Sequence, residues 1–196
     1  YASPMHIRLL ASSKKQVHLP SLRSVISTTT GISPLTCKTF EEKYRLPVSQ
    51  AFGIIEAGLP IINLRQSSEH PEAVGFGLPS FTVAILDHSF KPVPPGETGQ
   101  LAIKGPGMFD GYLSPPTRRE EVLKEGWFIT GDLASMTIDG LVEIKGRTKN
   151  VINVLGNKVF PNEVEEVINQ FEGIVESKVY GEKHVLMGEI VAADVM

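Results

Sequence analysis

The chain has 196 residues, a formal net charge of −3 and 41% hydrophobic residues. These values are typical of a soluble globular protein with one or two domains, and they do not suggest a nucleic-acid or anionic-membrane partner. The single Cys37 excludes an internal disulfide and a cysteine-rich metal site, and no apolar run reaches the length of a transmembrane segment. No signal-peptide features are visible, and we expect a cytoplasmic protein. The sequence does not start with methionine, so we expect that it comes from a longer or trimmed protein.

The first 60 residues predict a strand, a helix and a second strand that follow a short N-terminal helix. The order strand–helix–strand within about 30 residues makes the two strands parallel. Apolar positions of the central helix are Leu35, Cys37, Phe40 and Tyr44. The expected bounds are a helix over 5–15, a strand over 22–28, a helix from Ser33-Pro34 to Pro47 and a strand over 48–52.

Two loops leave the same edge of this predicted parallel unit, the edge at which open parallel sheets bind ligands. They are residues 28–33 and residues 53–58. Hydroxyls, small residues and the carboxylate of Glu56 meet there beside the ring of Phe52, which suits a purine, its sugar and a phosphate-bound cation. A plain crossover with Glu56 in solvent is the alternative interpretation.

Short strands alternate with Pro- and Gly-rich turns between residues 61 and 146, a pattern typical of a small distorted β-barrel. A hairpin turn is predicted at Asp139-Gly140 and a short helix at 115–124. Asp132 leaves one of the strands, and a carboxylate can accept two hydrogen bonds from the paired hydroxyls of a ribose. An aspartate that caps a turn would give the same pattern. The predicted strands are 61–64, 81–86, 101–104, 127–129 and 141–144.

A smaller α+β unit is predicted from about residue 147 onward. Strands at 151–154 and 159–160 flank a Gly156-Asn157 turn, and further strands are expected at 174–180 and 189–195. A helix begins with Pro161 and an acidic first turn and ends at Gly173. Its apolar stripe at helical spacing consists of Val164, Val167, Ile168 and Phe171.

Three polar segments beside glycines stand in a fixed order in the second half of the chain. An aromatic residue precedes Thr130-Gly131-Asp132, a Gly-Arg-x-Lys segment covers 146–149, and a Gly-x-Lys-Val-x-Pro-x-Glu segment begins at Gly156. Each alone is compatible with an ordinary tight turn. Together they resemble the adenylate-forming superfamily of acyl- and aryl-CoA synthetases, luciferases and peptide-synthetase adenylation domains, over the later part of such an enzyme.

The resemblance extends to the residues expected to hold the nucleotide. The segment from Ala51 to Glu56 is similar to the family's Gly-Tyr-Gly-x-Thr-Glu motif. It implies that Phe52 stacks on adenine and that Glu56 is catalytic and holds Mg²⁺ near the phosphates. Asp132 and Arg147 would contact the ribose. The nucleotide-binding residues implied in this way are Gly31, Ile32, Ser33, Ala51, Phe52, Gly53, Ile54, Ile55, Asp132 and Arg147. Ile55 replaces the threonine whose hydroxyl meets the phosphate in the family.

The resemblance also implies a division of the chain and a motion. Residues 1–146 would end the large adenylation domain, with a βαβ part over 1–60 and a β-barrel part over 61–146. Residues 147–196 would begin the small mobile domain, which rotates about Lys149 between two half-reactions. Gly156 and Lys158 would contact CoA, the cosubstrate whose pantetheine arm passes Gly156. The expected fold class is therefore α/β plus β-barrel plus α+β.

The implied activity is that of an acid–CoA ligase, which joins a carboxylic acid to ATP as an acyl-adenylate and then forms the CoA thioester. An adenylation domain that loads a carrier protein and a degenerate nucleotide-binding module are the alternatives. The family's phosphate loop with its lysine and its C-terminal Gly-Lys segment do not occur in these 196 residues. We therefore expect this piece alone to make no acyl-adenylate, because charge stabilisation is often the largest catalytic contribution.

Overall fold

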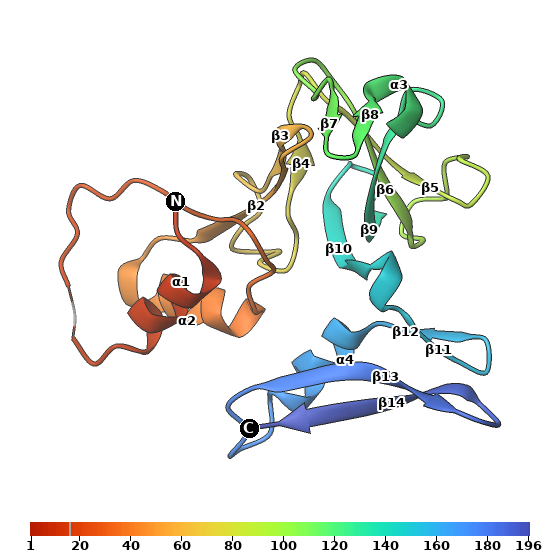
Figure 1. Ribbon diagram of the computed structural model, residues 1–196. Coiled ribbons are helices and arrows are strands. Elements are labelled where there is room, and N and C mark those ends of the chain that lie inside the picture. Colours follow the sequence, from red (N-terminus) through yellow and green to blue (C-terminus); the bar gives the residue numbers. More distant parts are fainter. Residues whose placement is uncertain (16) are drawn as a thin grey trace.

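The computed structural model describes residues 1–15 and 17–196, and these residues form three four-stranded sheets and one two-stranded hairpin. Figure 1 shows α1 and α2 beside the first sheet, the second sheet across from them, and the C-terminal sheet with α4 below the second. Within the described ranges, the helices are all too short or too polar to cross a bilayer. The mixture of helices with parallel and antiparallel strands confirms the α/β character of the prediction.

The first sheet contains the predicted strand–helix–strand unit. Val25 pairs with Val48 in parallel register, so the crossover connection is confirmed. The sheet order is β1-β2-β3-β4, in which only the first pair is parallel. The elements of this part are α1 (Pro4–Ser12), β1 (Val25–Ser27), α2 (Pro34–Tyr44), β2 (Val48–Ile54), β3 (Gly58–Ile62) and β4 (Phe76–Gly77).

Helix α2 begins and ends where local chemistry places its caps. The Ser33 hydroxyl accepts a hydrogen bond from the Thr36 amide at 3.2 Å, and Pro34 stands at the first turn, where its missing N–H costs nothing. Cys37, on the buried face of α2, is 2% exposed, and this burial raises the pKa of its thiol to about 12. Leu35, expected in the core, is 69% exposed. It stands two positions before Cys37, and residues two apart lie on different faces of a helix.

The chain after β2 departs from the expected loop. Strand β2 continues to Ile54 and turns directly into β3, so residues 55–57 form the turn of a hairpin. Ala51 pairs with Ile62 and Phe52 with Ile61. The strand predicted at 61–64 therefore belongs to the first sheet and not to a barrel, because its edge is taken by β2.

The predicted β-barrel is wrong as a closed structure, because the second sheet is open. Its order is β10-β9-β6-β5, and within the described residues its edge strands β10 and β5 are not paired with each other. The outer edge of β10 is already occupied: Val142 donates to the Gly75 carbonyl at 2.8 Å. The predicted turn at Asp139-Gly140 joins β9 to β10. The strands are β5 (Thr82–Leu86), β6 (Gly99–Lys104), β9 (Phe128–Met136) and β10 (Val142–Arg147).

The helix predicted at 115–124 is shortened to one turn. Residues before it form a hairpin of β7 (Gly111–Leu113) and β8 (Pro116–Arg118), in which Tyr112 pairs with Thr117. Only α3 (Arg119–Val122) remains helical. Backbone N–H and C=O groups of residues 116–118 form hydrogen bonds with β7 and are no longer free for a helix. Strand pairing therefore overrides the helix that the local sequence predicts.

The C-terminal sheet follows a single turn of 3-10 helix, η1 (Thr148–Asn150), and has the order β12-β11-β14-β13. Leu155 and Gly156 both have positive φ, 51° and 89°, and form the hairpin turn one residue earlier than predicted. Helix α4 ends at Ile168, and Val167 and Phe171 of the predicted stripe are 57% and 64% exposed. The elements are β11 (Ile152–Val154), β12 (Asn157–Val159), α4 (Pro161–Ile168), β13 (Ser177–His184) and β14 (Gly188–Val195).

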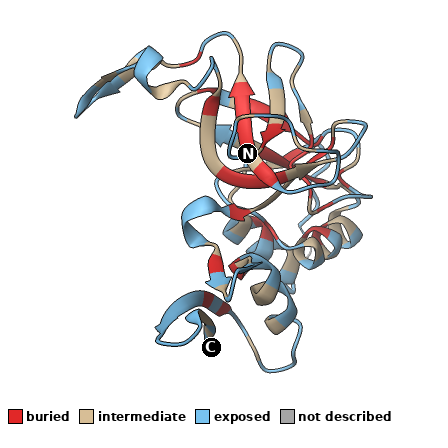
Figure 2. Ribbon diagram, turned by 90° about the vertical axis from the view of Figure 1, so that its right-hand side faces the viewer, coloured by how far each residue is buried: buried red, intermediate tan, exposed pale blue. Residues whose placement is uncertain are grey.

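Burial is concentrated in the first two sheets and their helices, whereas the C-terminal hairpin is largely exposed (Figure 2). One cluster lies between α1, α2 and the first sheet and includes Ile7, Phe40 and Val48. A second joins the first and second sheets through residues such as Ile61 and Val142. Phe52 packs against this second cluster and against a third, so β2 is fixed to the second sheet from two directions.

Candidate functional site

Asp132 is a buried carboxylate held by an arginine on the neighbouring strand. Asp132 on β9 pairs in register with Arg147 at the end of β10, and Arg147 Nε lies 2.9 Å from Asp132 Oδ1. The Asp132 side chain is 5% exposed, whereas that of Arg147 is 51% exposed. The guanidinium therefore covers the carboxylate from the solvent side. The structure thus brings together the two residues that the sequence assigns to a ribose.

The second oxygen of Asp132 is buried and has no hydrogen-bond partner within the described residues. Burial raises the pKa of Asp132 above its ordinary value, while Arg147 and the Thr130 hydroxyl act in the opposite direction. Buried carboxylate oxygens are usually paired, since an unpaired one costs about 1–3 kcal/mol or more. A hydroxyl that donates to this oxygen would remove the penalty, which makes Asp132 a candidate acceptor for a ligand hydroxyl.

Thr130 shapes the backbone that carries Asp132. Its hydroxyl donates to the Leu101 carbonyl at 3.1 Å and accepts from the Asp132 amide at 3.1 Å. Between them, Gly131 has a φ of 77°, a conformation that glycine adopts without strain. The sequence identified this triplet as a motif but did not reveal the threonine bonds, because Leu101 lies on another strand.

The loop at residues 31–33 is tied to β2 by a buried amide. Gln50, which is 4% exposed, accepts a hydrogen bond from the Ile32 amide at 3.3 Å. Its amide nitrogen donates to the Pro71 carbonyl. The Ile32 side chain points into the first core cluster, and the Ser33 hydroxyl caps α2. What this loop presents to a ligand is therefore mostly backbone, with open space at Gly31.

The turn after Phe52 carries the predicted metal ligand. Ala51 is buried, Phe52 and Ile54 are half-buried, and Ile55 is 98% exposed at the tip of the hairpin. Gly53 leaves no free room for a side chain, since a Cβ there would lie 3.1 Å from the Gly58 carbonyl oxygen.

Glu56 is held by two contacts from a distant segment. Tyr112 donates its hydroxyl to Glu56 Oε1 at 2.8 Å, and the Phe109 amide donates to the Glu56 carbonyl at 2.9 Å. Burial raises the pKa of Tyr112 to about 12, and the hydrogen bond to Glu56 adds to that shift. Glu56 is therefore positioned by the β7–β8 hairpin and is not simply in solvent. Sequence reasoning missed Tyr112, because nothing local links it to a residue 56 positions earlier.

A magnesium ion fits Glu56 only together with a nucleotide. Among the residues that the structure describes, no group of three or more histidine, cysteine or acidic side chains forms a metal site. Mg²⁺ commonly binds one or two carboxylates plus substrate phosphates and water. One positioned carboxylate is therefore a sufficient protein contribution if phosphates supply the remaining oxygens.

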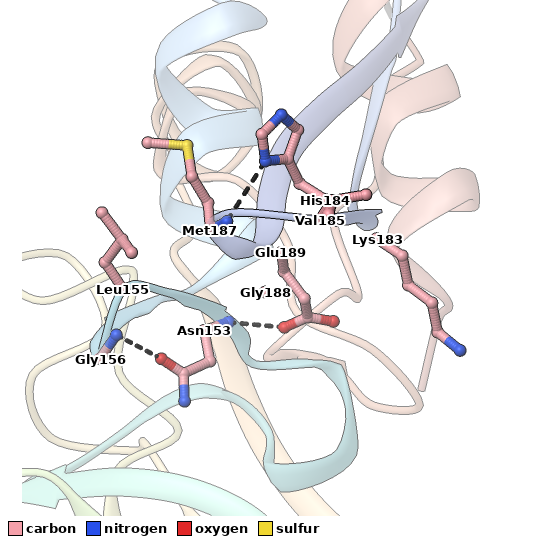
Figure 3. A pocket seen from close by; sticks show the side chains of 9 residues that line it. All are labelled: Asn153, Leu155, Gly156, Lys183, His184, Val185, Met187, Gly188 and Glu189. Carbon is pink, nitrogen blue, oxygen red and sulfur yellow. Dashed lines mark hydrogen bonds between the residues drawn. The ribbon is translucent and has the colours of Figure 1, made fainter.

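The residues assigned to the hinge and to CoA lie in and after η1. Lys149 is exposed within this single turn, and Lys158 is exposed on β12. Gly156 lines an open hollow of about 630 Å³ between the β11–β12 and β13–β14 hairpins (Figure 3). Phe52 and Asp132 do not line this hollow. The residues predicted to bind the nucleotide and those predicted to contact CoA therefore occupy separate parts of the chain.

Comparison with known proteins decides the family. A family model for the AMP-binding enzyme matches residues 1–113, which is more than half of the chain. The chain belongs to the AMP-binding enzyme family. It is 36% identical over 143 residues to a long-chain-fatty-acid–CoA ligase of Salmonella typhimurium, covering 72% of this chain and 26% of that protein.

Two further proteins match a larger share of the chain. A medium/long-chain-fatty-acid–CoA ligase of Mycobacterium tuberculosis is 33% identical over 182 residues, covering 91% of this chain and 32% of that protein. The ATP-bound MatB from Rhodopseudomonas palustris superimposes with a TM-score of 0.89 and 31% identity, covering 99% of this chain and 39% of that one. The chain therefore spans roughly a quarter to two fifths of the length of these proteins.

Proposed function

We propose that the protein containing this AMP-binding chain is an acid–CoA ligase. The observation that carries the proposal is the buried Oδ2 of Asp132 beside Arg147, which has no hydrogen-bond partner among the described residues and would suit a nucleotide ribose as an acceptor. Relatives named as fatty-acid–CoA ligases and as a feruloyl-CoA synthase support a carboxylic acid as substrate and CoA as acceptor. The proposal concerns the whole protein, because this chain is a fraction of the length of its relatives.

The proposed reaction has two steps. An oxygen of the carboxylic acid attacks the α-phosphorus of ATP, and the bond to pyrophosphate breaks, which leaves an acyl-adenylate. The sulfur of CoA then attacks the acyl carbon, and AMP departs with the electron pair of the broken C–O bond. Neutralisation of the phosphate charge and in-line alignment of the reacting atoms are what such chemistry requires. In water both would have to be organised anew for every encounter.

Residues of this chain would act mainly on the nucleotide. Asp132 would accept the ribose hydroxyls with Arg147 holding its other oxygen, and Phe52 would stack on adenine next to the backbone of residues 31–33. Glu56, fixed by Tyr112, would be the carboxylate that holds Mg²⁺ beside the phosphates. When bound, that ion neutralises phosphate charge and orients the oxygens.

The second step would depend on the part after η1. Rotation of residues 147–196 about Lys149 would bring Gly156 towards the acyl-adenylate, and Gly156 and Lys158 would contact CoA. We retain the hypothesis that the 196 residues by themselves make no acyl-adenylate. The division at residue 147 is part of the same proposal.

The decisive experiment is AMP binding to the full-length protein and to its Asp132→Ala variant by calorimetry. Losing a hydrogen bond to a charged group costs about 1.5–3 kcal/mol, so affinity should fall roughly tenfold or more. Asp139→Ala is the matched control, since Asp139 is an exposed aspartate at the far end of the same strand pair. Equal dissociation constants for Asp132→Ala and wild type would contradict the ribose assignment.

A second function, a nucleotide-binding module without turnover, is favoured by Ile55. This apolar residue is 98% exposed where the family places a phosphate-binding hydroxyl. Binding of AMP and of an acyl-adenylate mimic without acid-dependent pyrophosphate release would support the module. Release of pyrophosphate with fatty or aromatic acids would support the ligase, and transfer to CoA in preference to a carrier protein would identify the acceptor.

A further inference from the structure

The turn that contains Gly156 is held by a two-step relay of hydrogen bonds (Figure 3). The Gly156 amide donates to the side-chain oxygen of Asn153 at 2.9 Å. The backbone N–H of Asn153 in turn donates to Glu189 Oε2 at 2.7 Å. Glu189, on β14, is thereby connected to a turn 33 positions earlier through one intermediate residue.

The β11–β12 hairpin is paired within itself at three positions, but little backbone pairing ties it to β14. Strand β11 pairs with β14 at one position, Val154 with Gly188, whereas β13 and β14 pair at eight. Leu155 is also held at a φ of 51°, in a region that costs a non-glycine residue about 1–2 kcal/mol. The Glu189 carboxylate, which accepts from the Asn153 backbone N–H, therefore adds a link to β14 beside the 3.3 Å bond from the Leu155 amide to the Met187 carbonyl.

The surroundings of Glu189 are arranged for its carboxylate. Glu189 is half-buried, and a Cβ placed on Gly181 of β13 would lie 3.0 Å from Glu189 Oε1. The register places Gly181 opposite Val191, beside the carboxylate, so the small residue leaves room for the acid. A charge-assisted hydrogen bond at 2.7 Å is among the stronger interactions available to a partly exposed turn.

We propose that Glu189 is a positioning residue for the thioester-forming step, acting through Asn153 on the turn at Gly156. The inference rests on the proposed function, in which the pantetheine arm of CoA passes Gly156. An arm that must pass closely tolerates little displacement of the backbone, and misplacement of about 1 Å can cost about a hundredfold in rate. The residues of the first step, Asp132 and Glu56, have no part in this relay.

The test measures the two half-reactions separately in the full-length protein. Acid-dependent pyrophosphate release with palmitate or ferulate reports the first step, and transfer of the acyl group from preformed acyl-adenylate to CoA reports the second. Glu189→Ala should slow transfer about ten- to a hundredfold and leave pyrophosphate release within about twofold of wild type. Glu189→Gln keeps an acceptor oxygen and should restore most of the transfer rate. Glu182→Ala, an exposed glutamate on β13, is the control and should alter neither step.

Two further measurements separate positioning from general damage. In the absence of any ligand, hydrogen exchange of the Asn153 and Gly156 amides should accelerate in Glu189→Ala and not in Glu182→Ala. The double variant Asn153→Ala/Glu189→Ala should lose no more of the transfer rate than the more damaging single variant. Substitutions within one hydrogen-bond network do not have additive effects.

Each outcome has a distinct meaning. If Glu189→Ala slows both half-reactions equally, or slows neither, the inference is overturned while the ligase assignment stands. Wild-type protein that releases no acid-dependent pyrophosphate would contradict the proposed function itself.

Discussion

The hydroxyl of Tyr112 donates a 2.8 Å hydrogen bond to Glu56 Oε1, and this bond joins two hairpins that are far apart in the sequence. Tyr112 also stacks in a tilted arrangement on Phe109, with ring centroids 4.9 Å apart, and Phe109 donates its amide to the Glu56 carbonyl. Tyr112 of β7 therefore holds the carboxylate of Glu56, and Phe109, just before β7, holds its backbone.

Replacement of Tyr112 by phenylalanine should weaken the first half-reaction. The ring contact stays and only the donor is lost, so the Glu56 side chain gains freedom. We expect pyrophosphate release to fall about tenfold and the Mg²⁺ concentration for half-maximal rate to rise, because a hydrogen bond to a charged group is worth about 1.5–3 kcal/mol. Tyr180→Phe is a matched control, since Tyr180 donates to Asp194 at 3.3 Å and is exposed to a similar degree. An unchanged Mg²⁺ dependence in Tyr112→Phe would refute the positioning of Glu56.

The raised pKa of Asp132 predicts two opposite pH effects. Ribose binding needs the ionised acceptor, so affinity for adenosine should fall as the pH drops through this raised pKa. Adenosine is preferable to AMP because it has no titrating phosphate. The stability of the folded protein changes with pH in the opposite direction. The folded state binds the proton more tightly, so the contribution to the free energy of unfolding is present below the ordinary aspartate pKa and is lost as pH rises through the folded pKa.

Asp132→Asn removes the titrating group and should abolish both dependences. Calorimetry with adenosine and urea unfolding, each over a series of pH values, provide the measurements. Identical pH profiles for the variant and the wild type would show that another group controls this range.

Lys149 offers a test of the hinge. It lies in the single turn η1, and hinge residues absorb a large change in φ and ψ. Proline fixes φ, so Lys149→Pro should impair one half-reaction at least about tenfold more than the other. Lys149→Ala keeps the backbone free and should have a small, even effect. A uniform loss in Lys149→Pro would place the pivot elsewhere.

Gly75 couples the first two sheets and should tolerate no side chain. A Cβ there would lie 2.2 Å from backbone atoms of Ile62 and Asn63, and the φ of Gly75 is 101°. Gly75→Ala should lower the free energy of unfolding by more than about 2 kcal/mol, because the contact between sheets must open. Gly96→Ala isolates the strain, since Gly96 has a φ of 86° and free space around it. We expect Gly96→Ala to lower the free energy of unfolding by about 1–2 kcal/mol. Urea unfolding of both variants is the measurement, and equal losses would show that the clash at Gly75 is relieved.

Local patterns in the sequence determined several elements correctly. Ser33 and Pro34 begin α2 as predicted, because a capping hydroxyl and a proline act within one turn of the helix. The parallel pairing of β1 and β2 followed from their connection, and the motif order indicated the AMP-binding family that the comparisons confirmed. The pairing of Asp132 with Arg147 fits two motif residues on adjacent strands joined by a predicted hairpin turn.

Tertiary structure alone decided the features that depend on partners distant in the chain. The barrel does not close, because Gly75 occupies the edge of β10, and no local pattern near Val142 records that bond. The helix at 115–124 gave way to β8, because β7 was available to pair with it. Tyr112 and Glu189 became visible only once distant segments met Glu56 and Asn153. Periodicity and capping report interactions within a few residues, whereas hydrogen bonds across sheets and hairpins depend on which segments the whole chain brings together.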